Sequence, residues 1–514
     1  MLLIGEHDVV LEDFRQILFG NRKIEIDPLS LERVRNSYNF LESFYADKII
    51  YGINTGLGPM AQYRIADADR VALQYNAIRS HASGMGEPVN PEYVRSAMVV
   101  LLNNFLRGNS GIHPEVPELL CSMINHKITP VVPEHGGVGA SGDLVQLAHI
   151  GLALIGEGYV HHNGETISTA GAFAKYDLRP VSVHIREGLS IINGTCFMTG
   201  IGIINLIHAR NLLSWSVSAG TIINELMHSC DDSFSKELNR VKKHPGQNAI
   251  AELMRITLAD SKLIRNREEQ FYKNNHGNKH KLDDKVQEYY SIRCLPQILG
   301  PVLETIDNAE MVLINEANSS CDNPVVDPAN NNIYHGGNFH GDYVSLEMDK
   351  IKMCITKLSL IAERQINYLM NEKLNNMLPP FVNLGQLGVN FGMQGAQFTA
   401  TSTASENQTL SFPSYVHTIP NNNDNQDIVS MGTNSALMAK RVIDNTFQVL
   451  SIEMLSLVQA IDYLDVKNQL SSSNRKIYDQ IREKVGRFES DTIKYVELKK
   501  IKDYLCSRFF DDMV

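Results

Sequence analysis

The stretch RVIDNTFQVLSIEMLSLVQAIDYL, residues 441–464, shows most directly which kind of fold the chain adopts. Its apolar residues recur at alternating intervals of four and three positions: Ile443, Phe447, Leu450, Met454, Leu457, Ile461 and Leu464. This spacing places an apolar stripe along one side of a long helix, and such a stripe packs against other helices at a shallow angle. The pattern therefore predicts a long helix within a bundle.

Two further segments predict long helices. Residues 196–230 contain no proline and are rich in isoleucine and leucine, and residues 344–362 repeat the spacing with Val344, Met348, Ile351, Ile355, Leu358 and Ala362. Three such helices predict a mainly α fold, a central bundle with loops gathered at its ends. We expect a smaller N-terminal, cofactor-bearing domain over residues 1–200, the long-helix bundle over 201–465 and a helical cap over 466–514. The stripes are typical of an intramolecular core, and they leave assembly between subunits open.

Length, composition and charge exclude several classes of protein. The 514 residues are 43% apolar and 20% charged, as in globular proteins, and the net charge is −11. No run of lysine and arginine is long enough to follow a phosphate backbone, which argues against nucleic acid and anionic membranes as partners. We expect no membrane span, because no stretch of 18 apolar residues occurs, and no signal peptide, because Glu6 and Asp8 interrupt the N-terminal apolar segment. Seven scattered cysteines without a C-x-x-C pair predict a reduced, cytoplasmic protein with neither a zinc nor a disulfide framework.

The loop GGVGASGDLVQLAH, residues 136–149, is unusually poor in side chains. It lacks the lysine of a phosphate-binding loop and the G-x-S-x-G spacing of a serine hydrolase. A tight turn before a helix capped by Asp143 is an alternative, but such a turn needs only one or two glycines. A chemical interpretation fits better: the amide nitrogen of Gly142 attacks the carbonyl carbon of Ala140, because small residues allow the compressed backbone. Loss of two waters, one of them from Ser141, then leaves an alkene conjugated with a five-membered ring, which is a strong electrophile.

This loop resembles the signature of the aromatic amino acid ammonia-lyases, the family of histidine, phenylalanine and tyrosine ammonia-lyases. The resemblance extends through about residue 464. It implies a mainly helical fold and a homotetramer whose active sites are lined by more than one subunit. It also implies the prosthetic group 4-methylidene-imidazol-5-one (MIO), formed autocatalytically from Ala140, Ser141 and Gly142, with Ser141 as a catalytic residue. The implied reaction needs neither a metal nor a nucleotide.

Three other motifs carry over catalytic and carboxylate-binding residues by resemblance. Tyr51 in YGINTGLGP matches the tyrosine that removes the β-proton of the substrate. An isolated phenol with a pKa of about 10 is about three units too weak a base at neutral pH, so positive charge or helix N-termini are expected nearby. Asn193 in LSIINGT matches a residue beside the MIO that holds the substrate carboxylate. VQEYYSIRCLPQ carries over Gln287, the second phenol Tyr290, and Arg293 as the carboxylate anchor.

Without the resemblance these residues have ordinary alternatives. Tyr51 would be a packed loop aromatic, Asn193 a helix cap, and Arg293 one partner of a surface ion pair. The resemblance also implies further substrate-binding positions, which are Asn323, Phe339, Glu406, Asn425 and Gln426. The polar segment at 272–285 precedes VQEYYSIRC and is predicted to be an exposed loop that acts as a lid.

The substrate prediction depends on two segments. Ser80 and His81 match the pair that contacts the substrate ring, where histidine enzymes carry Ser-His, several tyrosine enzymes His-Leu and phenylalanine enzymes Phe-Leu. The segment NQDIVS (425–430) instead follows the tyrosine and phenylalanine enzymes. We expect an ammonia-lyase that converts L-tyrosine to trans-4-coumarate, with histidine ammonia-lyase (urocanate as product) and, less favoured, tyrosine 2,3-aminomutase as alternatives. An inactive helical scaffold would have lost at least one of these site residues, and all are present.

Overall fold

A computed structural model describes residues 1–273, 280–282 and 285–508, so the lid predicted at 272–285 lies partly outside the described residues. The chain divides into two compact units. Unit 1 comprises Met1–Ile207, Ala309–Asp349 and Pro413–Lys440, and unit 2 comprises His208–Asn308, Lys350–Phe412 and Arg441–Val514. The domain boundaries at residues 200 and 465 stay predictions, because compact units and domains need not coincide.

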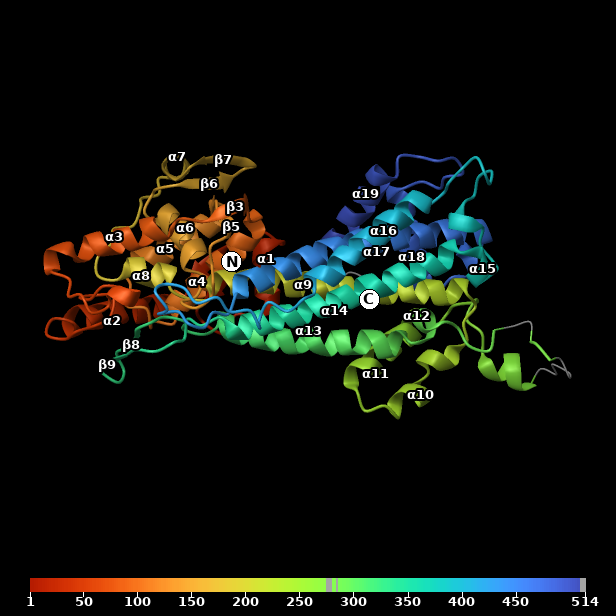
Figure 1. Cartoon of the computed structure of the whole chain (residues 1–514), viewed down its shortest axis with the longest axis horizontal. Coiled ribbons are helices and arrows are strands. Elements are labelled where there is room, and N and C mark those ends of the chain that lie inside the picture. The colour runs from red at the N-terminus through yellow and green to blue at the C-terminus, as the bar shows by residue number, and fades with distance from the viewer. Residues whose placement is uncertain (274–279, 283–284, 509–514) are drawn as a thin grey trace. The chain divides into compact units, whose positions relative to one another are not determined.

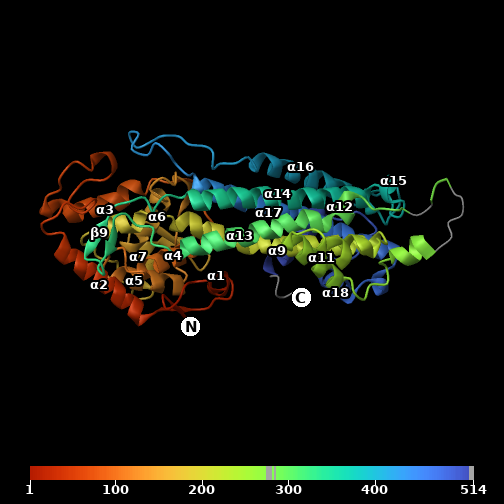
Figure 2. The same ribbon diagram turned by 90° about the horizontal axis from the view of Figure 1, so that it is seen from below.

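Four long helices contribute residues to both units (Figures 1 and 2): α9 (Cys196–Leu226), α13 (Leu295–Ala317), α14 (Asp342–Met370) and α17 (Gly432–Leu464). The three helices predicted from the sequence are confirmed as α9, α14 and α17. The apolar stripe of α14 is buried along its whole length, and that of α17 is buried from Ile443 to Ile461. The prediction of a mainly α fold is therefore confirmed.

Helix α13 has no counterpart among the predicted helices. Gly300 and Pro301 interrupt its apolar pattern, and both are poor helix formers. A side chain on Gly300 would lie 2.6 Å from the backbone nitrogen of Gln247, so the small residue allows a close approach of two segments in unit 2. Tertiary packing therefore outweighs the local preference.

Two helices, α9 and α17, have the length and mean hydropathy of a membrane span. In their most apolar windows, 89% and 78% of the residues are buried inside the protein. Burial of this extent is what core helices of a bundle require.

Unit 1 contains all strands of the described residues and most of the shorter helices. Its helices are α1 (Leu11–Leu18), α2 (Pro28–Phe44), α3 (Arg70–His81), α4 (Pro91–Leu106), α5 (Glu115–Asn125), α6 (Leu144–Leu154), α7 (Thr169–Ala174) and α8 (Glu187–Ile192). Its strands are β1 (Leu2–Ile4), β2 (Ile24–Ile26), β3 (Met85–Pro88), β4 (Thr129–Pro130), β5 (Pro133–His135), β6 (Tyr159–His162), β7 (Glu165–Ser168), β8 (Val325–Asp327) and β9 (Asn332–Tyr334). Strands β1 and β2 pair in parallel, and the pairs β3–β5, β4–β6, β6–β7 and β8–β9 are antiparallel. The sheets are small, with two or three strands each, so unit 1 is mainly helical.

Unit 2 adds shorter helices around its shares of the long ones. They are α10 (Lys236–Arg240), α11 (Pro245–Thr257), α12 (Tyr290–Arg293), α15 (Glu372–Asn375), α16 (Gln394–Leu410), α18 (Ser472–Lys484) and α19 (Lys494–Ser507).

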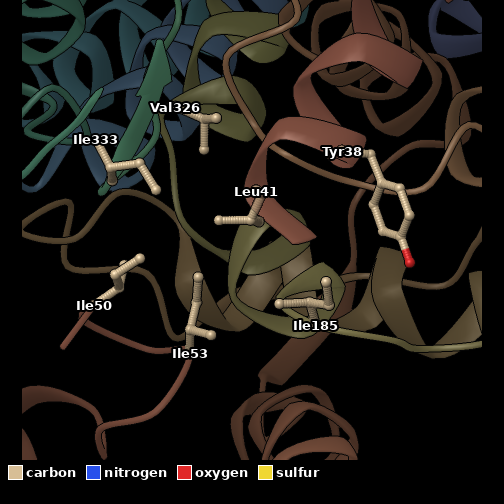
Figure 3. Close-up of a cluster of buried hydrophobic side chains, with 7 residues drawn as sticks. All are labelled: Tyr38, Leu41, Ile50, Ile53, Ile185, Val326 and Ile333. Atoms are coloured by element: carbon tan, nitrogen blue, oxygen red, sulfur yellow. The ribbon is translucent and has the colours of Figure 1, made fainter. Parts of the chain in front are cut away.

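An apolar cluster in unit 1 anchors the segment that carries Tyr51. Figure 3 shows side chains gathered around Leu41 of α2, with Ile50 and Ile53 from the following loop among them. The other members are Tyr38, Ile185, Val326 and Ile333. Because Ile50 and Ile53 flank Tyr51 in the sequence and are fully buried, the cluster limits the movement of that residue's backbone.

Candidate active site

The glycine-rich loop is held by three other parts of unit 1. The carbonyl of Gly139 accepts hydrogen bonds from Ser430 Oγ (3.0 Å) and from the backbone N–H of Gly341 (3.1 Å). The N–H of Asp143 donates to the carbonyl of Gly194 at 2.8 Å. Residues far apart in the sequence thus fix both ends of the Ala140-Ser141-Gly142 tripeptide.

Two glycines of this loop have no room for a side chain. A Cβ on Gly142 would overlap the carbonyl oxygen of Gly194, and a Cβ on Gly139 would overlap Ser430 Oγ. Their φ angles, +70° and +75°, also lie in the left-handed region that favours glycine. Neither glycine could therefore be replaced without moving the backbone on either side of Ser141.

Side-chain amides converge on Ser141. Gln426 Nε2 donates to Ser141 Oγ at 2.9 Å, and Asn193 Nδ2 donates to Ser141 O at 3.2 Å. Asn193 Oδ1 in turn accepts the backbone N–H of Asn323 at 3.1 Å. The structure brings together four of the residues that the sequence assigned to the site, and each amide donor can stabilise negative charge that develops near Ser141.

Asp143 stands at the N-cap position of α6, but its side chain does not cap that helix. Its carboxylate instead accepts the N–H of Met198 in α9 at 2.7 Å and contacts the hydroxyl of Thr433 in α17. Burial raises the pKa of Asp143 to about 7. The alternative of a helix capped by Asp143 is therefore not what the structure shows, because this carboxylate bonds to two other helices instead.

Tyr51 is held through its backbone and through its hydroxyl. Its backbone N–H donates to His335 Nε2 at 3.3 Å, and its phenol oxygen accepts the N–H of Gly58 at 2.9 Å. Gly58 opens a short helical turn, Gly58–Met60. A backbone N–H aimed at a phenol oxygen stabilises negative charge on that oxygen, as a base of this kind requires.

Gln74 is a positioning residue that the sequence analysis missed. It is fully buried in α3, where its Nε2 donates to the carbonyl of Gly52 at 2.8 Å and its Oε1 accepts the N–H of Leu189 at 2.9 Å. It therefore joins the residue after Tyr51 to α8, the helix that ends at Ile192, immediately before Asn193. Its only sequence signal is a polar residue on the buried side of a helix. The sequence analysis also missed His335, which lies in a loop and contacts the backbone of Tyr51, although the motif around Phe339 contains it.

Ser80 and His81 form the last turn of α3. His81 Nδ1 lies 2.8 Å from the carbonyl oxygen of Ala77 and 3.2 Å from Ser80 Oγ. Phe339 is half-buried. Asn425 is exposed and lies in a turn, where its own backbone N–H donates to the carbonyl oxygen of Asn422 at 3.2 Å. Among the described residues, none of these predicted site residues makes a hydrogen bond to Ser141.

The other predicted residues belong to unit 2. Gln287 and Arg293 line a pocket of about 230 Å³ together with Arg267 and Glu288, and burial raises the pKa of Glu288. The guanidinium carbon of Arg293 lies 4.8 Å from the ring centroid of Tyr290, a cation–π contact. Arg293 Nε is buried without a hydrogen-bond partner within the described residues. The structure thus groups Gln287, Tyr290 and Arg293, and it assigns them to a different unit from Ser141.

Glu406 lies in α16, also within unit 2. Its carboxylate accepts hydrogen bonds from Arg441 at 3.3 Å and from Asn445 Nδ2 at 2.7 Å. These contacts leave its side chain 44% exposed, so a ligand can reach it.

A comparison with family models shows which family the chain belongs to. The model of the aromatic amino acid lyases matches residues 9–483. The chain belongs to the aromatic amino acid lyase family. It is therefore a carbon–nitrogen lyase. The alternative of an inactive helical scaffold predicts that at least one site residue has been lost, and all of them are present.

Relatives of this lyase differ in substrate and in reaction. A tyrosine 2,3-aminomutase from Myxococcus sp. (strain Mx-B0) is 38% identical over 485 residues, 93% of this chain and 92% of that protein. A histidine ammonia-lyase from Natranaerobius thermophilus is 35% identical over 490 residues, 95% of this chain and 93% of that protein. The solved structure of a tyrosine aminomutase from Streptomyces globisporus matches with a TM-score of 0.94 at 31% identity, covering 98% of this chain and 96% of that one. Family membership therefore leaves substrate and reaction open.

The aromatic lyase family uses MIO, and the residues of this lyase fit that group. The cradle formed by Gly139 and Gly142 excludes side chains, and the amides of Asn193 and Gln426 are aimed at the central serine. Asn193 donates to the carbonyl oxygen of Ser141, which the ring would keep and which needs a donor, whereas Gln426 donates to the hydroxyl that ring formation would remove as water.

Proposed function

We propose that this lyase forms MIO from Ala140-Ser141-Gly142 and converts L-tyrosine to trans-4-coumarate and ammonia. One observation carries the proposal: the donors of Asn193 and Gln426 converge on Ser141 inside a cradle that excludes side chains. When formed, the group would supply an electrophile for the amino group of the substrate, which makes ammonia a better leaving group.

Tyr51 would remove the β-proton of the substrate. The N–H of Gly58 stabilises the negative charge that makes the phenol oxygen a base, and His335 and Gln74 limit the movement of the Tyr51 loop. A base held in this way acts without a large reorganisation cost.

Arg293 would anchor the substrate carboxylate through paired N–H donors, with Asn193 as a second donor. Gln287, Tyr290 and Glu406 would complete the polar part of the site. The resemblance to the family implies a homotetramer whose sites are lined by more than one subunit, and we include it in the proposal. A cytoplasmic location completes it.

His81 and Ser80 would recognise the para-hydroxyl of tyrosine. With its proton on Nδ1, facing the carbonyl of Ala77, neutral His81 keeps Nε2 as an acceptor for that hydroxyl. Asn323, Phe339 and Asn425 would form the remaining walls. Histidine stays the alternative substrate, because an imidazole N–H can donate to the same acceptor.

A second candidate function is tyrosine 2,3-aminomutase. It is favoured by the 38% identical relative that carries that name. Both reactions begin with the same elimination of ammonia, and the aminomutase then returns ammonia to the β-carbon of the same substrate.

Product analysis of the purified enzyme distinguishes these functions. We expect trans-4-coumarate as the main product from L-tyrosine, and a mass two waters below that of the unmodified chain. Urocanate from L-histidine as the sole product would overturn the tyrosine assignment, and β-tyrosine as the main product would replace the lyase by the aminomutase. Turnover by a chain with the full, unmodified mass would overturn the MIO. The matched control is Ser141→Ala, which should show neither product nor mass loss.

A further inference from the structure

Three side chains that have no part in the proposed reaction converge in unit 1. His113 precedes α5, Glu115 opens it, and His184 lies in the loop before α8. One ligand atom from each residue lies within 4.8 Å of the other two. We propose that His113, Glu115 and His184 bind a divalent transition-metal ion, with Zn²⁺ as the best match.

The donor set is the first reason. Two imidazoles and one carboxylate form a set that Zn²⁺ accepts readily, with a water as the fourth ligand. Tetrahedral bonds of about 2.0–2.1 Å require donor atoms about 3.4 Å apart. His113 Nδ1 and Glu115 Oε2 are already 3.6 Å apart, and the Glu115 side chain is 56% exposed, so it can swing toward an ion.

The two histidines are held together by a residue that is not itself a ligand. Glu187 is fully buried, and its carboxylate accepts the backbone N–H of His113 at 3.1 Å and that of His184 at 2.8 Å. The two imidazole centroids lie 4.9 Å apart. This arrangement lowers the entropy that the site would lose on binding an ion, because the segments are already ordered.

The polar atoms of the cluster are the third reason. Nε2 of His184 is buried and has no hydrogen-bond partner among the residues that the structure describes. The ring of Tyr38 packs edge-on against His113 at 5.1 Å and forms an apolar wall. His113 remains 29% exposed, which leaves a path from solvent. A metal ion would give the buried nitrogen its missing partner.

Cysteine spacing could not indicate this site, because its ligands are histidines and a glutamate from separate segments. It also differs from the catalytic proposal, which needs no metal: none of its ligands is among the residues assigned to substrate or MIO. A failure of one proposal therefore leaves the other standing.

Calorimetric titration of the purified full-length enzyme with ZnCl₂ tests the proposal. We expect one Zn²⁺ per chain. Loss of a residue that only supports a ligand lowers metal affinity roughly 10- to 100-fold, so loss of a ligand in Glu115→Gln or His184→Gln should lower the Zn²⁺ affinity at least that much. The matched control is His7→Gln, since His7 and Glu6 form an exposed histidine–carboxylate pair 3.9 Å apart. That variant should bind Zn²⁺ like the wild type.

A second readout protects the test against misfolding of His184→Gln. Zn²⁺ at about 100 times its dissociation constant shifts a linked folding equilibrium about 100-fold, so it should raise the thermal midpoint of the wild type and of His7→Gln. Glu115→Gln, an exposed substitution, should keep the lyase activity and lose this rise. Absence of Zn²⁺ uptake by the wild type, or equal affinity in Glu115→Gln and the wild type, would overturn the proposal; zinc held by cysteine thiols would give the latter result.

Discussion

Replacing Gln74 with methionine tests whether one buried side chain positions the predicted base. The substitution keeps the length and apolar packing of the side chain but removes both of its hydrogen bonds. The carbonyl of Gly52 and the N–H of Leu189 are then left without their partner in a buried position.

The cost follows from those two contacts. A buried polar group without a partner costs about 1–3 kcal/mol, so two cost about 2–6 kcal/mol. The apolar methionine recovers part of this, and we expect a net local destabilisation of about 2–4 kcal/mol. At the lower limit the population of locally opened α8 rises about 30-fold.

Hydrogen exchange and steady-state kinetics measure the two consequences separately. In Gln74→Met, the Leu189 amide should exchange roughly 30-fold faster or more. Turnover of tyrosine should fall about 100-fold, because displacing a catalytic group by about 1 Å has that effect. The control is Gln16→Met, since Gln16 is half-buried and its side chain bonds only Glu12 and Arg22 in exposed contacts; it should change stability by less than about 0.5 kcal/mol.

Two results would contradict this reasoning. Wild-type exchange at Leu189 in Gln74→Met would show that the hydrogen bonds contribute nothing to α8. Fast exchange with unchanged turnover would show that Gln74 stabilises the helix without positioning Tyr51.

Four further predictions concern the site. Tyr51→Phe should retain the fold and the mass loss of MIO formation but reduce kcat about 10²- to 10⁴-fold, and near-normal coumarate production would rule out Tyr51 as the base. Gly142→Ala should show the full chain mass by mass spectrometry, because its Cβ would overlap the carbonyl of Gly194; a two-water deficit would contradict this. Burial raises the pKa of Asp143 from 3.8 to about 7, so the folded protein binds this proton more tightly than the unfolded chain does. The resulting contribution to the free energy of unfolding is present below about pH 4, and up to about 4 kcal/mol of it is lost as the pH rises to 7. Thermal midpoints of Asp143→Asn should lack this slope, and parallel pH profiles of the two proteins would refute it. His81→Leu should lower kcat/KM for tyrosine relative to phenylalanine about 5- to 150-fold, the value of one unpaired phenol hydroxyl, and an unchanged ratio would remove His81 from recognition.

Much of the fold could be predicted because its signals are local. The stripes of α14 and α17 follow the helical repeat, so the side that each helix buries can be read without knowledge of its partners. Helix α13 could not be predicted in this way. Its Gly300 is tolerated because another segment, Gly246–Gln247, lies against it, and no local pattern contains that information.

The candidate site divides along the same line. Ser141 and its glycines stand out in the sequence because removing side chains from a whole loop has few other purposes. Gln74, His335 and the carboxylate of Asp143 do not stand out, since each acts through partners from distant segments. Gln426 was found by resemblance, but only its contact with Ser141 connects it to the reactive tripeptide.

The amino-acid order alone determined the helical period, the side chains missing from the 136–142 loop and the residue types available for chemistry, because these properties belong to neighbouring positions. Tertiary structure alone decided which donors reach Ser141, how the Tyr51 loop is held and that Gln287, Tyr290 and Arg293 belong to a unit other than that of Ser141. The physical reason is the short range of hydrogen bonds and packing: they act only between groups in contact, and folding decides which distant residues meet.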